Sequence, residues 1–209
     1  MSKSKHRYKV YNGKAVKEIL ENSRVFILIG LFAIGIIIGS TAIKNNGETA
    51  EKIRYIIGNY AMQRAGQGMS ENFFNSLLSN MMFVLVSVFL GFSLIGSPLI
   101  MTLPFFKGAA IGAVSGYLYL EYKLMGLGYS VLMIYPSSVI CMVALIIIFN
   151  ESCEYSHNAY LKAINGRGHF EKDETKLFLI RQFIFSLIVA VSALIDAVCV
   201  ELFSGFFVF

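Results

Sequence analysis

The sequence predicts an all-α integral membrane protein, a bundle of about five transmembrane helices. Apolar residues make up 56% of the 209 residues and charged residues only 15%, against about 45–50% and 25% in soluble domains. The mean hydropathy is +0.64. Long charge-free stretches recur, and Lys and Arg gather on one side of them. A soluble domain of this size could not cover its surface with so few charges, so lipid is expected to surround much of the chain.

Five stretches are apolar enough to be candidate spans of a bilayer core, which takes roughly 20 residues in a helix. They are residues 25–43, 81–103, 105–120, 124–149 and 182–203. The first is expected to be an uncleaved helix rather than a signal peptide, because the basic segment 1–24 before it is long. Pro136 lies inside the fourth stretch. This proline either bends that helix or ends it.

The distribution of Lys and Arg predicts the orientation. Segment 1–24 holds seven of them, the turn between the second and third spans holds Lys107, and the inner loop 150–181 holds five. The other side holds only five, in the outer loop 44–80 and at Lys123. The positive-inside rule then places the N-terminus in the cytoplasm and the C-terminus outside. Topology explains the basic N-terminus, so the expected partner is the lipid bilayer and not a nucleic acid.

The outer loop 44–80 is predicted to contain an extracytoplasmic amphipathic helix. Ile53, Ile56 and Tyr60 follow helical spacing. Phe73 and Phe74 belong to a second helical start that leads into the next span. These five residues are the candidate partner-binding residues. The alternative is an ordinary loop helix that packs on its own spans.

Glycines at a spacing of four residues mark two of the spans. Gly108, Gly112 and Gly116 lie in the third span, and Gly35 and Gly39 lie in the first. Small residues at this spacing let two helix backbones approach closely, so tight helix packing is predicted. A glycine-lined pore is the alternative. Lys107, one residue before the stripe, is expected to extend its ammonium group to the cytoplasmic interface.

Two acids lie in the last span. Asp196 is about 21 Å along the helix from its start, and Glu201 is about 28 Å along, at 1.5 Å per residue. The two side chains point about 140° apart, so they are not a catalytic pair. Asp196 therefore lies in the hydrocarbon, as either a polar anchor between helices or a proton or ion site.

The chain shows no pattern typical of an enzyme. It has no GxSxG, HExxH or P-loop pattern, and its three Cys and three His lack the spacing of metal ligands. We therefore expect no catalytic residues, no metal and no cofactor.

Several short motifs together resemble the stage II sporulation protein M family. They include Gly96 and Pro98 in the run Gly91–Leu99, then Lys107 in Phe106-Lys107-Gly108, then the glycine stripe. The resemblance also takes in Phe73 and Phe74, Tyr135-Pro136 and Val200-Glu201, and it extends over nearly the whole chain in order. The inner loop is longer and more charged than the family pattern, and Asp196 departs from it.

This resemblance implies a non-enzymatic scaffold in the septal or engulfing membrane of a sporulating cell. The implied partners are the peptidoglycan-degrading stage II sporulation proteins D and P, which would thin septal peptidoglycan during engulfment. A homo-oligomer is also among the expected assemblies. The alternative function is a transporter or permease subunit that uses Asp196 and a glycine-lined helix interface.

Overall fold

The computed structural model describes residues 23–44, 48–165 and 172–203. Every regular element in these ranges is helical. Four helical stretches are long and apolar enough to cross a membrane, namely Ser23–Ala42, Met69–Gly91, Gly96–Ile164 and Lys172–Phe203. The first of them is here named the N-terminal helix. The described chain is therefore an all-helical, multi-pass membrane protein, as the composition predicts.

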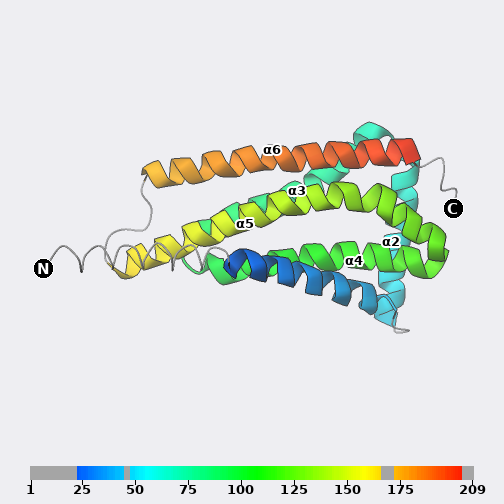
Figure 1. Cartoon of the computed structure of the whole chain (residues 1–209), viewed down its shortest axis with the longest axis horizontal. Helices are drawn as coiled ribbons and strands as arrows, with labels where there is room; N and C mark the ends of the chain where they lie inside the picture. The colour runs from blue at the N-terminus through cyan, green and yellow to red at the C-terminus, as the bar shows by residue number, and fades with distance from the viewer. Residues whose placement is uncertain (1–22, 45–47, 166–171, 204–209) are drawn as a thin grey trace, which may run out of the picture.

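The longest stretch, Gly96–Ile164, folds back on itself. It consists of α4 (Gly96–Tyr129), the π-helix η1 (Ser130–Ile134) and α5 (Tyr135–Ile164). Lys123 interrupts α4 with non-helical angles, φ 50° and ψ −121°. Just after it, Gly126 lies against the carbonyl oxygen of Leu118. The chain reverses at Lys123, and α4 and α5 run beside each other (Figure 1).

The turn between α3 (Met69–Gly91) and α4 lies earlier than the predicted break at residue 104. The predicted spans 81–103 and 105–120 are therefore displaced, because the chain turns at residues 92–95. Gly96 packs against the carbonyl oxygen of Leu90, an approach that a larger residue would block. This turn contains no charged residue, so a search for charge-free stretches runs straight through it. Pro104 is tolerated inside α4.

The predicted inner loop 150–181 is mostly helical. Helix α5 continues to Ile164, and α6 begins at Lys172 and ends at Phe203. Helix α6 has 32 residues, or about 48 Å at 1.5 Å per residue, against an apolar core of roughly 30 Å. The helices therefore extend beyond the apolar layer, and ion pairs join their polar ends: Lys162 with Glu174 at 2.5 Å and Arg181 with Glu151 at 3.0 Å.

Helix α2 (Glu48–Gly66) lies across one end of the bundle (Figure 1). It is not among the stretches that could span a membrane. Arg54 attaches it to the end of the N-terminal helix by donating two hydrogen bonds to the carbonyl oxygen of Ile43, at 2.6 and 2.9 Å. Ile57 is buried, and Gly58 lies against the hydroxyl group of Tyr117 in α4.

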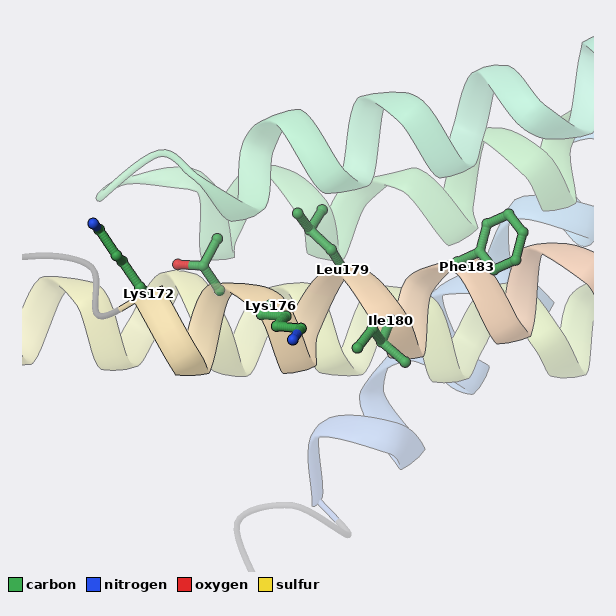
Figure 2. Close-up of a pocket in the computed structure, with 6 residues that line it drawn as sticks. Lys172, Lys176, Leu179, Ile180 and Phe183 are labelled. Atoms are coloured by element: carbon green, nitrogen blue, oxygen red, sulfur yellow. The ribbon is translucent and has the colours of Figure 1, made fainter.

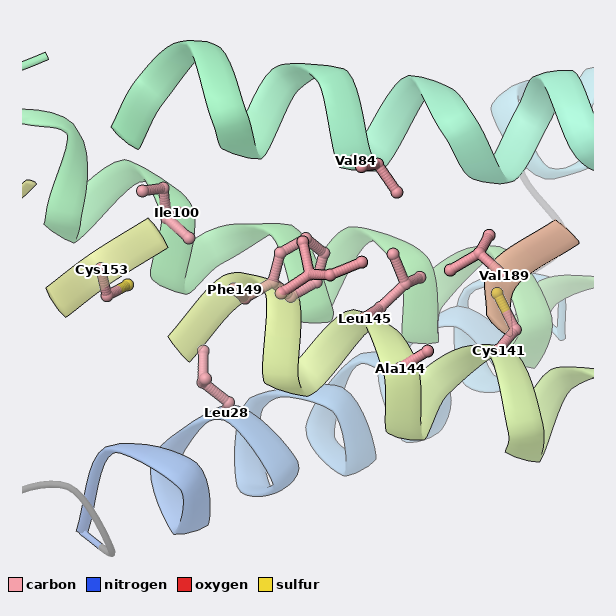
Figure 3. Close-up of a cluster of buried hydrophobic side chains, with 10 residues drawn as sticks. Leu28, Val84, Ile100, Cys141, Ala144, Leu145, Phe149, Cys153 and Val189 are labelled. Atoms are coloured by element: carbon pink, nitrogen blue, oxygen red, sulfur yellow. The ribbon is translucent and has the colours of Figure 1, made fainter. Parts of the chain in front are cut away.

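The main hydrophobic core is centred on α5, with side chains from the N-terminal helix, α3, α4 and α6 around it (Figure 3). Its ten buried residues are Leu28, Val84, Ile100, Cys141, Ala144, Leu145, Ile148, Phe149, Cys153 and Val189. An aromatic cluster lies near the turn between α3 and α4. The rings of Tyr155 and Phe178 stack with centroids 4.3 Å apart, and Phe92 contacts both edge-on. This cluster fixes the turn against α5 and α6.

Candidate functional site: a polar cavity around Asp196

The glycines predicted to mediate packing lie where the N-terminal helix crosses α4. Gly35 lies against the backbone of Phe105, and Gly39 lies against the backbone of Ala109. From the other side, Gly108 and Gly112 contact the backbone of the N-terminal helix, and a β-carbon at Gly116 would lie 3.0 Å from the Cα of Ser40. A β-carbon at most of these positions would overlap main-chain atoms. The two stripes therefore form a helix–helix contact.

Asp196 is only 7% exposed and accepts three hydrogen bonds from three other elements. Arg64 of α2 forms an ion pair with its Oδ2 atom, and Ser76 of α3 donates to the same oxygen. Ser137 of α5 donates to Oδ1 at 2.8 Å. One carboxylate thus connects α2, α3, α5 and α6. Glu201, by contrast, is exposed.

Arg64 reaches this carboxylate because α2 ends two residues later. Gly66 is the last residue of α2, and α3 begins at Met69. The side chain of Asn72 donates to the carbonyl oxygens of Arg64 and Gln67, at 3.1 and 3.2 Å, and so fixes the turn between the two helices. Burial works against the charged form of Arg64. The attraction of Asp196 and its hydrogen bond more than offset that burial and raise the pKa of the guanidinium group.

The π-helix η1 places Ser137 beside Asp196. Pro136 lies in the first turn of α5, directly after this element. Proline lacks an N–H group and crowds the preceding turn, and a wider helical turn relieves both effects. The chain therefore stays helical through Pro136, and the proline does not end this helical segment. Ser130 Oγ, inside η1, also bonds back to the carbonyl oxygen of Gly126.

Lys107 does not lie in the turn between the second and third spans, where it was predicted. It is an interior residue of α4, because the turn before that helix lies at residues 92–95. Its ammonium group donates to Asn80 Oδ1 at 2.5 Å and lies 5.3 Å from the ring centroid of Phe83. Among the described residues, no acid lies within ion-pairing distance of Lys107. The expectation that this lysine marks a cytoplasmic turn was wrong.

These polar groups line a cavity of about 270 Å³ between α2, α3, α4, α5 and α6. Its charged residues are Arg64, Lys107 and Asp196. Its uncharged polar side chains come from Tyr60, Asn75, Ser76, Ser79, Asn80, Ser137 and Ser138. Lys107 forms its described hydrogen bond with Asn80 and not with a serine hydroxyl, so the geometry is not that of an activated serine nucleophile. Within the described ranges, no three His, Cys, Asp or Glu side chains gather as a metal site.

A second, shallower cavity lies on the surface of α6 (Figure 2). Lys172, Thr175, Lys176, Leu179, Ile180 and Phe183 line it, and it holds about 750 Å³. All six come from one stretch of a single helix. It therefore differs from the Asp196 cavity, which is lined by residues of η1 and of five helices.

The predicted partner-binding residues divide between inward and outward positions. Ile56 is 64% exposed, Tyr60 is 46% exposed and Phe74 is 65% exposed, whereas Ile53 and Phe73 are half-buried. Tyr60 also lines the cavity. Phe73 and Phe74 contact each other edge-on with centroids 5.4 Å apart.

Sequence reasoning missed Arg64 as the partner of Asp196 and missed the serines around it. In the sequence, Arg64 is one of the positive charges of the outer loop 44–80 that predict the orientation. The clue was present, since Ser76, Ser79 and Asn80 place polar groups on one side of the helix that leads into the second span. Ser137, directly after Pro136, is likewise a polar residue inside a predicted span.

The fold and the cavity define the class of the protein: a multi-pass helical membrane protein with a buried ion pair near one end of its bundle. A family model described as stage II sporulation protein M matches residues 28–204, and the chain therefore belongs to that family. No curated protein and no solved structure matches it. This membership shows that the protein is a sporulation-related membrane protein.

Proposed function

We propose that the protein is a non-enzymatic membrane scaffold that recruits peptidoglycan-degrading proteins to the septal membrane during engulfment. Membership in the stage II sporulation protein M family supports this role. The proposed partners are the stage II sporulation proteins D and P. Septal and engulfing membranes are the proposed location.

The proposed topology has five crossings, because the stretch Gly96–Ile164 reverses at Lys123 and so counts as two. The N-terminal helix, α3, α4, α5 and α6 would then alternate in direction. The charge asymmetry supports an orientation with the N-terminus in the cytoplasm and α2 outside. Because Lys107 lies inside α4, it no longer counts among the charges of the inner side, and the difference between the two sides falls by only one charge.

The single observation that carries the scaffold role is the exposed apolar surface of α2. Tyr55 is 73% exposed, and Ile56 and Tyr60 are also exposed. In the spans, exposed apolar side chains face lipid, but α2 is not a span. Large aromatic and aliphatic side chains outside the hydrocarbon are the kind of group that anchors protein interfaces. The alternative to this docking surface is contact of α2 with the outer leaflet.

The transporter alternative has less support. A carboxylate that moves protons or ions has to be free to change its partners. Asp196 instead has three donors around it, one of them a guanidinium group. This geometry favours a structural anchor, and a structural anchor fits a scaffold.

The test is affinity purification of the tagged, full-length protein from gently solubilised native membranes. A Tyr55→Ser and Ile56→Ser double variant is compared with Asn59→Ser, an exposed polar position on the same helix. Loss of an interface anchor commonly costs 2 kcal/mol or more, so recovery of the hydrolases is expected to fall by about tenfold or more. The control should recover them normally. Equal recovery with all three proteins would refute this docking surface, and recovery of a cytoplasmic ATPase in place of the hydrolases would favour the transporter.

A further inference from the structure

The Asp196 cavity contains more positive than negative charge. Its charged lining groups are two cations, Arg64 and Lys107, and one carboxylate, Asp196. The carboxylate is engaged by Arg64 and two serines. A cavity enclosed by apolar helices screens charge poorly, so the remaining positive charge favours an anion.

Lys107 provides most of that uncompensated charge. It lies eleven residues into α4, or about 16 Å from the start of the helix at 1.5 Å per residue. Its ammonium group therefore belongs to the interior of the bundle and not to the turn at residues 92–95. Its described contacts are one neutral amide oxygen and the face of one aromatic ring. An ammonium group has three donors, so it can make further hydrogen bonds.

Arg64 also has an unused donor. Its Nε atom is buried and has no hydrogen-bond partner among the described residues. Buried donors are nearly always satisfied by protein, water or a ligand. The cavity is large enough for such a group, because its 270 Å³ is far above the roughly 10–15 Å³ that one water needs.

The cavity has a polar edge between α3 and α4. Its exposed lining residues are Tyr60 of α2, Asn75 and Ser79 of α3 and Ala110 of α4. Asn75 and Ser79 are one helical turn apart on α3, and they offer an amide and a hydroxyl group. Ala110 on α4 is small. These exposed polar groups give the cavity an edge that a polar group can contact from outside. Leu78 and Phe106, on the same two helices, are exposed apolar residues close to this edge in sequence.

We propose that this cavity binds a phosphate-type anionic group, with Lys107 and Arg64 as its cationic contacts and the serine and asparagine side chains as hydrogen-bond donors. Phosphate oxygens accept charge-assisted hydrogen bonds from both kinds of cation. Asp196 keeps Arg64 in place and would limit the charge of the anion. The group would come from an anionic phospholipid or from free phosphate. The proposal does not rest on the docking surface of α2, although Tyr60 belongs to both sites.

The experiment uses the full-length protein in a neutral detergent, with two probes. The first is dioleoylphosphatidylglycerol, measured by native mass spectrometry against dioleoylphosphatidylcholine. The second is inorganic phosphate, measured as a shift in thermal unfolding against chloride at equal ionic strength. Lys107→Gln is compared with Lys176→Gln, which removes an exposed lysine from α6. Lys107→Gln removes an uncompensated charge from the interior, so the variant is expected to fold.

Binding by the wild type and Lys176→Gln is expected to be about tenfold or more stronger than by Lys107→Gln, the typical effect of losing one charge-assisted contact. A difference confined to phosphatidylglycerol identifies a lipid headgroup, and a difference seen with inorganic phosphate identifies a soluble anion. The proposal is overturned if neither probe binds the wild type, or if both probes bind Lys107→Gln as well as they bind the wild type.

Discussion

Replacing Asp196 by Asn is expected to destabilise the protein strongly, because it leaves Arg64 charged and buried without a counter-charge. The two side chains are only 12% and 10% exposed, so solvent screens the pair weakly. Asparagine preserves the volume of the side chain. Its carbonyl oxygen can accept from one of the two serines, and its amide group can donate to the hydroxyl oxygen of the other. The loss is therefore mainly electrostatic. Breaking one side of a buried ion pair costs about 3–5 kcal/mol.

The assay is thermal unfolding of the purified protein in detergent. For a chain of this size, 1 kcal/mol corresponds to about 2–4 °C, so the midpoint should fall by roughly 6–20 °C. Glu201→Gln is the matched control, because that acid lies on the same helix but is exposed. Its effect should stay within about 0.5 kcal/mol.

A double variant separates the ion pair from other effects of the substitution. Arg64→Met combined with Asp196→Asn removes both charges, so it should be more stable than Asp196→Asn alone, with a coupling energy of about 0.5–3 kcal/mol. A midpoint for Asp196→Asn within 2 °C of the wild type, or strictly additive single effects, would refute the reasoning.

Three further predictions use the same unfolding assay. Gly112→Val should cost about 1–3 kcal/mol, since its β-carbon would overlap the backbone of the N-terminal helix; Gly30→Ala, with nothing within 4 Å, should be neutral or slightly stabilising, and equal losses would contradict the close approach. Phe178→Ala should cost about 3–5 kcal/mol because the ring is buried in the aromatic cluster, whereas Phe183→Ala, at an exposed position, should cost much less; a small loss for both would argue against the cluster. Lys123→Gly should stabilise by about 1 kcal/mol, because its φ of 50° favours glycine, and destabilisation would show that the reversal depends on the lysine side chain.

Much of the fold could be predicted because lipid imposes a local rule. A helix in hydrocarbon needs a long apolar stretch, and charges interrupt such stretches at the membrane surface. The rule located the N-terminal helix and the apolar part of α6. It placed the turn between α3 and α4 too late, because residues 92–95 form a turn without charges. Backbone packing of Gly96 on Leu90, and not polarity, defines that turn.

The candidate site was only half predictable. Asp196 stood out because an acid deep in an apolar helix is costly and needs a partner. Its partner Arg64 could not be predicted, because it belongs to α2, a polar helix that is not a candidate span. In the sequence it is only one of the positive charges of the outer loop. Lys107 was likewise predicted to lie at the membrane interface, because the sequence predicted the turn between the second and third spans at residue 104 instead of at residues 92–95.

The sequence by itself determined the class of the protein, its apolar helices, its glycine stripes and the acid Asp196 inside the last span, since each of these depends on residues close together in the chain. Only the tertiary structure decided which groups meet at that acid. Arg64 and Asp196 are 132 residues apart, and Ser76 and Ser137 come from two further helices. Such contacts depend on the rotation and tilt of whole helices, which packing across the bundle sets and local spacing does not.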